Sequence, residues 1–189
     1  MRKPIVAANW KMHKTPGETA DFLRDFVVLA KAADDVDIVI APPFVSLAAA
    51  STALAQHDGI KLAAQNMFYE QSGAFTGEIS PIMLREMLIN YVILGHSERR
   101  QIFGESDAFV NRKVLAALKH GITPILCIGE TLQENESGQT EAVLERQVAA
   151  SPIVGSSQGR SWSKTSARTL ARNGHRNAGT MGVSAVPGG

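Results

Sequence analysis

The sequence predicts an α/β fold built on a parallel β-sheet. Short apolar segments rich in β-branched residues recur at intervals of roughly 20 to 30 residues, and each is followed by a segment with helical periodicity. Alternation of strands and helices at this spacing is typical of βα units, whose strands lie parallel. The predicted strands are continuously apolar, which indicates a sheet that is covered on both faces.

Five strands are expected, and three of the helices between them can be delimited. The strands are predicted at residues 5–8, 36–41, 60–64, 91–94 and 122–128. The helices are predicted at residues 17–31, 111–120 and 131–148. Their expected buried faces consist, in chain order, of Phe22, Phe26, Leu29 and Ala30; of Val114, Leu115 and Leu118; and of Leu132, Val143, Leu144 and Val148.

The composition is that of a soluble globular protein. The 189 residues suffice for one domain with a substantial core, and 44% hydrophobic with 20% charged residues is an ordinary balance. No run of about 18 apolar residues occurs, and residues 1–11 are too short and polar-ended for a secretory signal. Cys127 is the only cysteine, which excludes an intrachain disulfide and a cysteine-based metal cluster. We therefore expect a cytoplasmic protein without a membrane partner.

The net charge of +1 conceals two unlike parts of the chain. Residues 1–150 hold 14 of the 19 basic side chains and all 18 acidic ones, a net charge of −4. Residues 151–189 are rich in glycine, serine and arginine, and their charged side chains are all basic: Arg160, Lys164, Arg168, Arg172 and Arg176. We therefore expect an acidic globular domain at 1–150 and a separate basic tail at 151–189.

The tail has more than one interpretation. Its basic side chains fall at every fourth position, which would place them on one helical face able to bind nucleic acid. The many glycines and serines favour instead a disordered segment, or one that is translated out of frame. A one-base shift of the codons for residues 174–180 permits Gly-Thr-Ala-Thr-Pro-Glu-Gln. The out-of-frame interpretation is preferred, and nucleic-acid binding is the alternative.

A histidine at the junction of a predicted strand and helix is the strongest functional candidate. Residues 91–94 form an apolar strand, Gly95 permits a tight turn, and Ser97 with Glu98 begins a helix. His96 would then lie against the positive end of the helix dipole, which disfavours the imidazolium form. A neutral ring at this position can polarise a carbonyl oxygen. The alternative is a histidine that only caps the loop.

Other polar residues also cluster directly after predicted strands. They are Asn9 and Lys11, Gln65 and Asn66, and Cys127 with Glu130. In parallel α/β folds the carboxyl edge of the sheet is where sites form. A nucleotide site is not expected, because no G-x-G-x-x-G or G-x-x-x-x-G-K-[ST] pattern follows the first strand.

Six short segments are distinctive in combination. They are residues 8–12 (Ala-Asn-Trp-Lys-Met), 41–43 (Ala-Pro-Pro), 64–66 (Ala-Gln-Asn), 73–78 (Gly-Ala-Phe-Thr-Gly-Glu), 94–100 (Leu-Gly-His-Ser-Glu-Arg-Arg) and 127–130 (Cys-Ile-Gly-Glu). In this order and spacing they closely resemble the triosephosphate isomerase family, and the likeness runs from residue 3 to about residue 148. The resemblance implies a (β/α)8 TIM barrel, of which about five βα units are legible here.

The resemblance also implies the site residues and the reaction. Asn9 and Lys11 would contact a three-carbon ketose or aldose phosphate, and His96 would polarise its carbonyl, a role already known for this family. Glu98 and Ser97 would support the site. The implied reaction is the interconversion of dihydroxyacetone phosphate and D-glyceraldehyde 3-phosphate through an enediolate, in glycolysis and gluconeogenesis, without a cofactor or a metal.

The family resemblance further implies a homodimer. The loop at residues 71–79 would project towards the partner subunit, so that Phe75 and Thr76 would lie in the interface. The resemblance also places Cys127 at a buried position, where a packing role is expected.

The chain departs from the family pattern in its last part. The family's general base is a glutamate after the sixth strand, and no such residue is found within residues 1–189, where Glu145 is the last acidic residue. Five strands do not close a barrel, and the glycine-rich phosphate site expected after strands seven and eight is not found. The alternative to an isomerase is therefore a catalytically inactive barrel remnant.

Overall fold

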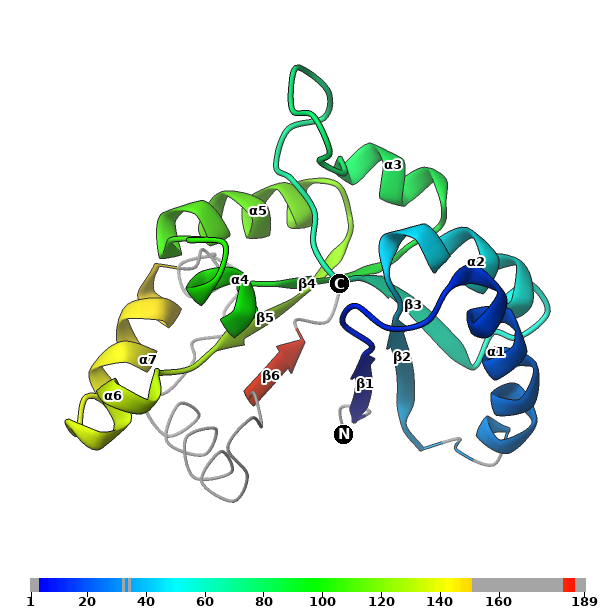
Figure 1. Ribbon diagram of the computed structural model, residues 1–189, viewed down its shortest axis with the longest axis horizontal. Coiled ribbons are helices and arrows are strands. Elements are labelled where there is room, and N and C mark those ends of the chain that lie inside the picture. The colour runs from blue at the N-terminus through cyan, green and yellow to red at the C-terminus, as the bar shows by residue number, and fades with distance from the viewer. Residues whose placement is uncertain (1–3, 32, 34, 151–181, 186–189) are drawn as a thin grey trace. The chain divides into compact units, whose positions relative to one another are not determined.

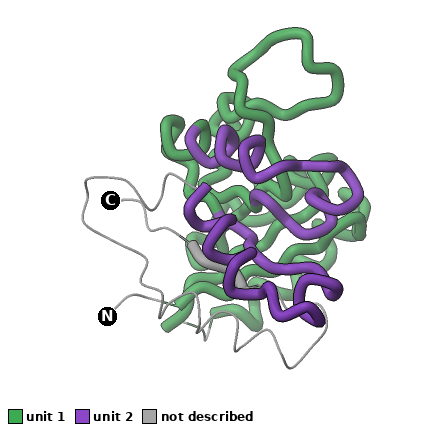
Figure 2. The backbone as a smooth tube through the Cα atoms, turned by 90° about the vertical axis from the view of Figure 1, so that its left-hand side faces the viewer, with its two compact units in different colours: residues 1–93, 116–124, 185–189 green, residues 94–115, 125–184 purple. Residues whose placement is uncertain are grey.

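A computed structural model describes residues 4–31, 33, 35–150 and 182–185, the last of these ranges by its backbone alone. The chain divides into two compact units, which are coloured separately in Figure 2. Unit 1 comprises residues 1–93, 116–124 and 185–189, and unit 2 comprises residues 94–115 and 125–184.

The strands confirm the predicted α/β class. They are β1 (Ile5–Asn9), β2 (Asp37–Ala41), β3 (Ile60–Ala64), β4 (Tyr91–Leu94), β5 (Thr123–Ile128) and β6 (Gly182–Ala185), and Figure 1 labels them. Strand β1 pairs in parallel with β2, β2 with β3, and β3 with β4. The sheet order is β1-β2-β3-β4-β5-β6, so each strand neighbours the next one in sequence. This is the order that successive units of a (β/α)8 barrel adopt.

Helices occupy the connections between these strands. They are α1 (Pro16–Ala30), the 3-10 helix η1 (Phe44–Ser46), α2 (Leu47–Leu54), α3 (Pro81–Glu86), α4 (Ser97–Gln101), α5 (Asp107–Lys119), α6 (Leu132–Glu136) and α7 (Thr140–Ala149). Helix α1 begins with a capping box, in which Thr15 accepts from the Glu18 amide and the Glu18 carboxylate accepts from the Thr15 amide.

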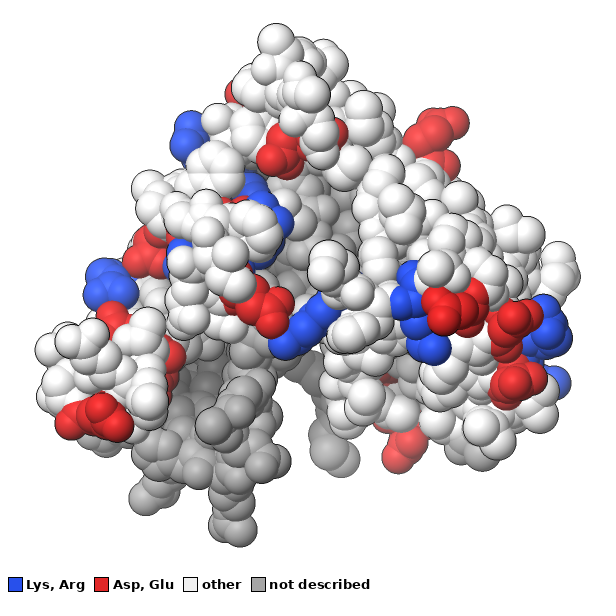
Figure 3. Space-filling view, viewed as in Figure 1, with Lys and Arg blue, Asp and Glu red and all other residues white. Residues whose placement is uncertain are grey.

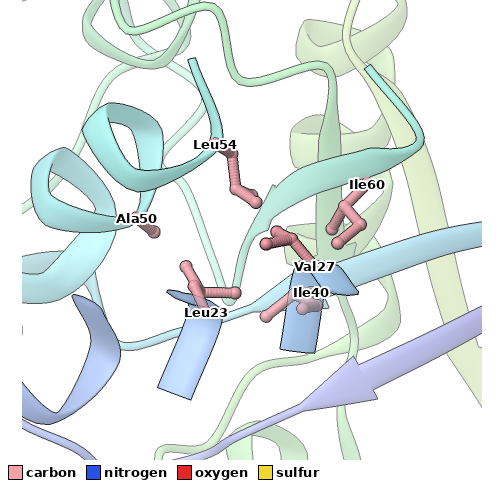
Figure 4. Packing of buried hydrophobic residues seen from close by; sticks show 6 residues of the cluster. All are labelled: Leu23, Val27, Ile40, Ala50, Leu54 and Ile60. Atoms are coloured by element: carbon pink, nitrogen blue, oxygen red, sulfur yellow. The ribbon is translucent and has the colours of Figure 1, made fainter. Parts of the chain in front are cut away.

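The core of unit 1 is an aliphatic cluster formed by α1, α2, β2 and β3. Figure 4 shows its six buried side chains, which are Leu23, Val27, Ile40, Ala50, Leu54 and Ile60. Burying an aliphatic side chain of this size stabilises the fold by about 1.5–3 kcal/mol. The cluster therefore fixes α1 and α2 against β2 and β3.

The buried face of α1 differs from the predicted one. Leu29 is 76% exposed and Phe22 36% exposed, whereas Leu23 is fully buried. The Phe22 ring instead meets the Trp10 ring edge-on, with centroids 5.2 Å apart. The prediction was wrong for these two residues because Phe22 covers the loop after β1, which turns Leu23 towards the sheet.

Helix α5 also buries a different face from the predicted one. Val114 is buried as predicted, but Leu115 and Leu118 are 48% and 42% exposed. The buried stripe contains Val110, Lys113, Val114 and Ala117, which are spaced at helical intervals. The prediction was wrong because a fully buried lysine occupies one position of this stripe.

Residues 131–148 form two helices, where one was predicted. Helix α6 has its own capping box at Thr131 and Glu134, and the chain then turns at Gly138, whose φ is +73°. Only glycine adopts such a φ at low cost, so the helix cannot continue through this residue. Leu132 is 75% exposed as a result, whereas Val143 and Leu144 of α7 are buried.

Burial on both faces of the sheet holds for the central strands and fails at β1. Strand β5 is buried from Pro124 to Ile128. In β1 the exposure alternates, and Val6 is 59% exposed. The difference follows from the position of β1 at the end of the sheet order.

Charged side chains of both signs are interspersed on the face drawn in Figure 3. None of the helices in the part of the chain that the structure describes is long and apolar enough to cross a membrane. The predictions made for the basic tail, namely disorder, out-of-frame translation or nucleic-acid binding, cover residues 151–189, of which 151–181 and 186–189 lie outside the described residues. Residues 182–185 form β6, a strand that was not predicted.

Candidate active site

The first group of candidate residues lies in unit 1, at the end of β1 and in the loop that follows it. The Lys11 amide donates to Oδ1 of Asn9, at 3.0 Å, so the structure brings these two residues together. Lys11 has a φ of +52°, a left-handed conformation that is uncommon for a residue with a side chain. Its side chain is exposed and is therefore accessible to a ligand.

Gln65, at the end of β3, holds the strained backbone of Lys11. Its Nε2 donates to the Lys11 carbonyl, at 2.9 Å, and to the Ala41 carbonyl, at 2.8 Å. The Trp10 amide also donates to the Ala41 carbonyl, at 3.0 Å. A left-handed backbone costs of the order of 1–3 kcal/mol and persists only where its surroundings determine it. The hydrogen bonds of Gln65 stabilise this backbone conformation. The sequence indicated the position of Gln65 after a strand but not this role.

The far end of the same loop is anchored as well. The Lys14 ammonium lies 5.0 Å from the centroid of the Phe22 ring and 5.7 Å from that of the Trp10 ring. The Ser46 hydroxyl donates to the Lys14 carbonyl, at 3.1 Å. These contacts fix the loop between β1 and α1 on both sides of Lys11.

The second group of candidate residues lies in unit 2, at the start of α4. His96 is the N-cap of this helix, and its side chain is 5% exposed. Its Nδ1 accepts from the Glu98 amide, at 3.2 Å. Because an amide can only donate, Nδ1 carries no proton in this arrangement, and a neutral ring carries its proton on Nε2. Ser97 is the first residue of the helix.

The cap and the predicted chemistry of His96 use different ring nitrogens. The capping alternative is correct as a description of Nδ1, and it leaves Nε2 as the proton-bearing atom available for the role that the resemblance implies for His96. The Glu98 carboxylate lies 3.5 Å from Nδ1 and is itself partly exposed. The cap therefore defines the tautomer in which His96 could polarise a carbonyl.

Gly95 is the residue that allows this turn. Its φ is +72°, and a Cβ added there would lie 2.9 Å from Nη2 of Arg100, 3.0 Å from Cγ1 of Val110 and 3.1 Å from the Cys127 carbonyl oxygen. The last of these neighbours is backbone and cannot move aside without disturbing β5. Both the conformation and the space therefore require glycine.

Replacing Gly95 with alanine is expected to lower the free energy of unfolding by about 2–3 kcal/mol, through left-handed strain together with overpacking. Gly138→Ala is a matched control, because its φ is +73° and a Cβ there would meet nothing within 4 Å. The control should cost only about 1–2 kcal/mol. Equal losses in urea unfolding of the two variants would show that crowding at Gly95 contributes nothing.

A buried charge network follows α4. Oε1 of Glu105 accepts from Nε of Arg99 and from Nζ of Lys113, the latter at 2.7 Å. The Glu105 and Lys113 side chains are 4% and 1% exposed. Burial raises the pKa of Glu105, but the hydrogen bonds and charges of Lys113 and Arg99 outweigh it, so the pKa lies below its ordinary value. Sequence reasoning missed this network, since a lysine in a helix is normally assigned to the surface.

Residues at the end of β5 and directly after it have structural contacts. Burial raises the pKa of the Cys127 thiol to about 12, although the Arg100 charge acts in the opposite direction. Such a thiol is not a nucleophile at neutral pH, which agrees with the packing role expected for it. Gln147 of α7 accepts from the Gly129 amide, at 2.8 Å, and donates to the Gly129 carbonyl, at 3.0 Å. Sequence reasoning missed this bidentate contact because Gln147 carries no local signal.

Within the described residues, no three His, Cys, Asp or Glu side chains are grouped so that they could hold a metal ion. The candidate residues thus form two groups, each described within its own unit. Asn9, Lys11 and Gln65 form one in unit 1, and His96 with Glu98 forms the other in unit 2.

A family model and several curated proteins match most of this chain. The family model described as triosephosphate isomerase matches residues 4–161. A triosephosphate isomerase of Dictyoglomus thermophilum is 51% identical over 148 residues, which are 78% of this chain and 59% of that protein. That of Carboxydothermus hydrogenoformans is 52% identical over 148 residues, with the same shares of the two chains.

A triosephosphate isomerase of Symbiobacterium thermophilum is 56% identical over 150 residues, 79% of this chain and 58% of that protein. The chain therefore spans less than two thirds of the length of these curated relatives. The match to the family model covers both groups of candidate residues and most of the sequence. The chain belongs to the triosephosphate isomerase family.

Proposed function

We propose that the protein interconverts dihydroxyacetone phosphate and D-glyceraldehyde 3-phosphate by moving a proton between adjacent carbons through an enediolate. The observation that carries this proposal is the geometry of His96. Its Nδ1 is occupied by the Glu98 amide, so the neutral ring offers an N–H at Nε2 from a buried position. A donor held ready in a buried site stabilises a developing oxyanion far more than water does.

Lys11 is proposed to balance the charge of the substrate phosphate and of the enediolate, with Asn9 contacting the substrate beside it. Support comes from the exposure of Lys11 and from the hydrogen bonds that fix its backbone. A ligand group on a fixed backbone loses little entropy when substrate binds. Glu98 and Ser97 are proposed as supporting residues at the start of α4. The family resemblance implies that a carboxylate abstracts the substrate proton, and no glutamate in residues 1–189 matches that base.

We also propose that the protein is a cytoplasmic homodimer that acts in glycolysis and gluconeogenesis. Phe75 in the loop at 71–79 is 41% exposed, and its ring lies 4.5 Å from that of Phe68, between centroids. An aromatic residue presented in this way suits a protein interface. Residues 1–150 are proposed to form the barrel domain, and residues 151–189 to form a basic segment that follows it in the chain.

Conversion of D-glyceraldehyde 3-phosphate by the 189-residue chain, followed in a coupled assay, tests the proposal. The Lys11→Met variant is expected to lower kcat/KM about 100-fold or more, because it removes the cation that meets the developing charge. Lys31→Met, at the exposed end of α1, is the matched control and should leave kcat/KM unchanged. A rate for the natural chain that equals the rate in buffer would contradict the proposal.

A further inference from the structure

Arg100 holds the backbone on both sides of His96. Its Nε donates to the Gly95 carbonyl, at 2.7 Å, and this carbonyl belongs to the peptide that precedes His96. Its own amide donates to the His96 carbonyl, at 3.0 Å. A single residue thus binds the oxygens of the two peptide groups that flank the candidate electrophile.

The position of the Arg100 guanidinium requires a glycine at residue 95. A Cβ on Gly95 would lie 2.9 Å from Nη2 of Arg100, so the missing side chain is what allows the guanidinium to lie over this turn. The side chain is 15% exposed, which excludes most competing water. The Gly95 turn therefore determines where the guanidinium of Arg100 lies.

Asp107 fixes the other end of the guanidinium. Its Oδ1 accepts from Nη1 of Arg100, and its Oδ2 accepts from Nε of Arg146 in α7, at 3.2 Å. Arg100 therefore connects the His96 turn to the first residue of α5, and through Asp107 to α7. A lysine could pair with Asp107, but its single ammonium lacks the fixed fork that serves two partners in defined directions.

We propose that Arg100 is a positioning residue for the proposed isomerisation. It holds the Gly95–His96 peptide so that Nδ1 of His96 stays on the Glu98 amide and the ring proton stays on Nε2. This inference rests on the proposed function of His96 as the electrophile. Without the Arg100 contact, the turn loses its side-chain hydrogen bond, and the His96 ring is free to exchange between tautomers.

The test measures His96 directly and needs no turnover. In the natural chain, ¹⁵N NMR of the labelled imidazole is expected to show an unprotonated Nδ1 and a protonated Nε2. In Arg100→Met, the two nitrogen signals should move towards each other as tautomers mix, and the Glu98 amide should exchange with solvent at least tenfold faster. Circular dichroism identifies the conditions in which the variant is folded.

Two further variants separate positioning from general stability. Arg146→Gln removes the other partner of Asp107 and should leave the His96 signals unchanged. Arg100→Lys, which serves as the test variant if Arg100→Met does not fold, should retain part of the amide protection but not the single tautomer. Natural ring signals and natural Glu98 exchange in both Arg100 variants would overturn the inference. If the natural chain has no isomerase activity, the proposed function fails while these signals remain measurable.

Discussion

Replacing Glu105 with glutamine is expected to lower the free energy of unfolding by about 3–5 kcal/mol. The carboxylate is buried and accepts from Arg99 and from Lys113, and the Lys113 side chain is 1% exposed. A neutral amide at this position leaves the Lys113 ammonium buried without its carboxylate. The loss of one partner from a buried ion pair is costly because the remaining charge keeps its full desolvation penalty. Urea unfolding monitored by circular dichroism measures the change.

The matched control is an ion pair on the surface. Arg24 donates to Asp21 in α1, and the two side chains are 70% and 71% exposed. Asp21→Asn should therefore change the free energy of unfolding by no more than about 0.5 kcal/mol. The double variant Glu105→Gln, Lys113→Met should lose less than the sum of the two single variants, because it leaves no buried charge unmatched. If Glu105→Gln cost no more than Asp21→Asn, the network would contribute nothing.

The pH dependence of stability gives the same variant a second readout. The folded pKa of Glu105 lies below the ordinary value of 4.5. A lowered folded pKa means that the ionised carboxylate stabilises the protein above pH 4.5, and that this stabilisation is lost as the pH falls through the folded pKa. The natural chain should therefore lose more stability below pH 4.5 than Glu105→Gln does.

The fold could be predicted because its signal is local. Continuous apolar runs at the spacing of βα units are enough to place the strands, and the β4 bounds were predicted without error. Helix faces were harder, because a helical repeat does not say which of two adjacent apolar stripes meets the sheet. In α1 the aromatic Phe22 favoured the wrong stripe, since its ring packs on Trp10 while Leu23 enters the core. Tertiary packing, which periodicity does not encode, decides between such stripes.

The sequence was enough to select the candidate site residues, but it did not predict the hydrogen bonds that hold them in place. Asn9, Lys11 and His96 follow strands and match a known family pattern, so their positions follow from the sequence. The contacts that hold them join residues far apart in the chain, such as Gln65 and Lys11, which are separated by 54 positions. No single-sequence pattern predicts such a pair. The left-handed backbone of Lys11 could not be predicted either. It is tolerated because of hydrogen bonds to Asn9 and Gln65, which only the folded structure shows.

Replacing His96 with asparagine is expected to lower kcat by about 10²–10³-fold, the cost of removing a donor that stabilises a developing oxyanion. Oδ1 of asparagine can accept from the Glu98 amide as Nδ1 does, so the cap of α4 should be retained. The free energy of unfolding is therefore expected to change by less than about 1 kcal/mol. Steady-state kinetics and urea unfolding of the same preparation measure both quantities.

His57→Asn is the control for this substitution, because His57 follows α2 in unit 1, away from the candidate residues in sequence, and is only half-buried. It should leave kcat unchanged. The comparison is informative because the cap and the proposed donor are two nitrogens of one ring, and asparagine, whose Oδ1 corresponds to Nδ1, replaces the first function without the second. A fall in kcat at constant stability assigns Nε2 to the chemistry. A fall in stability at constant kcat would reduce His96 to the cap of α4 and would remove it from the proposed mechanism.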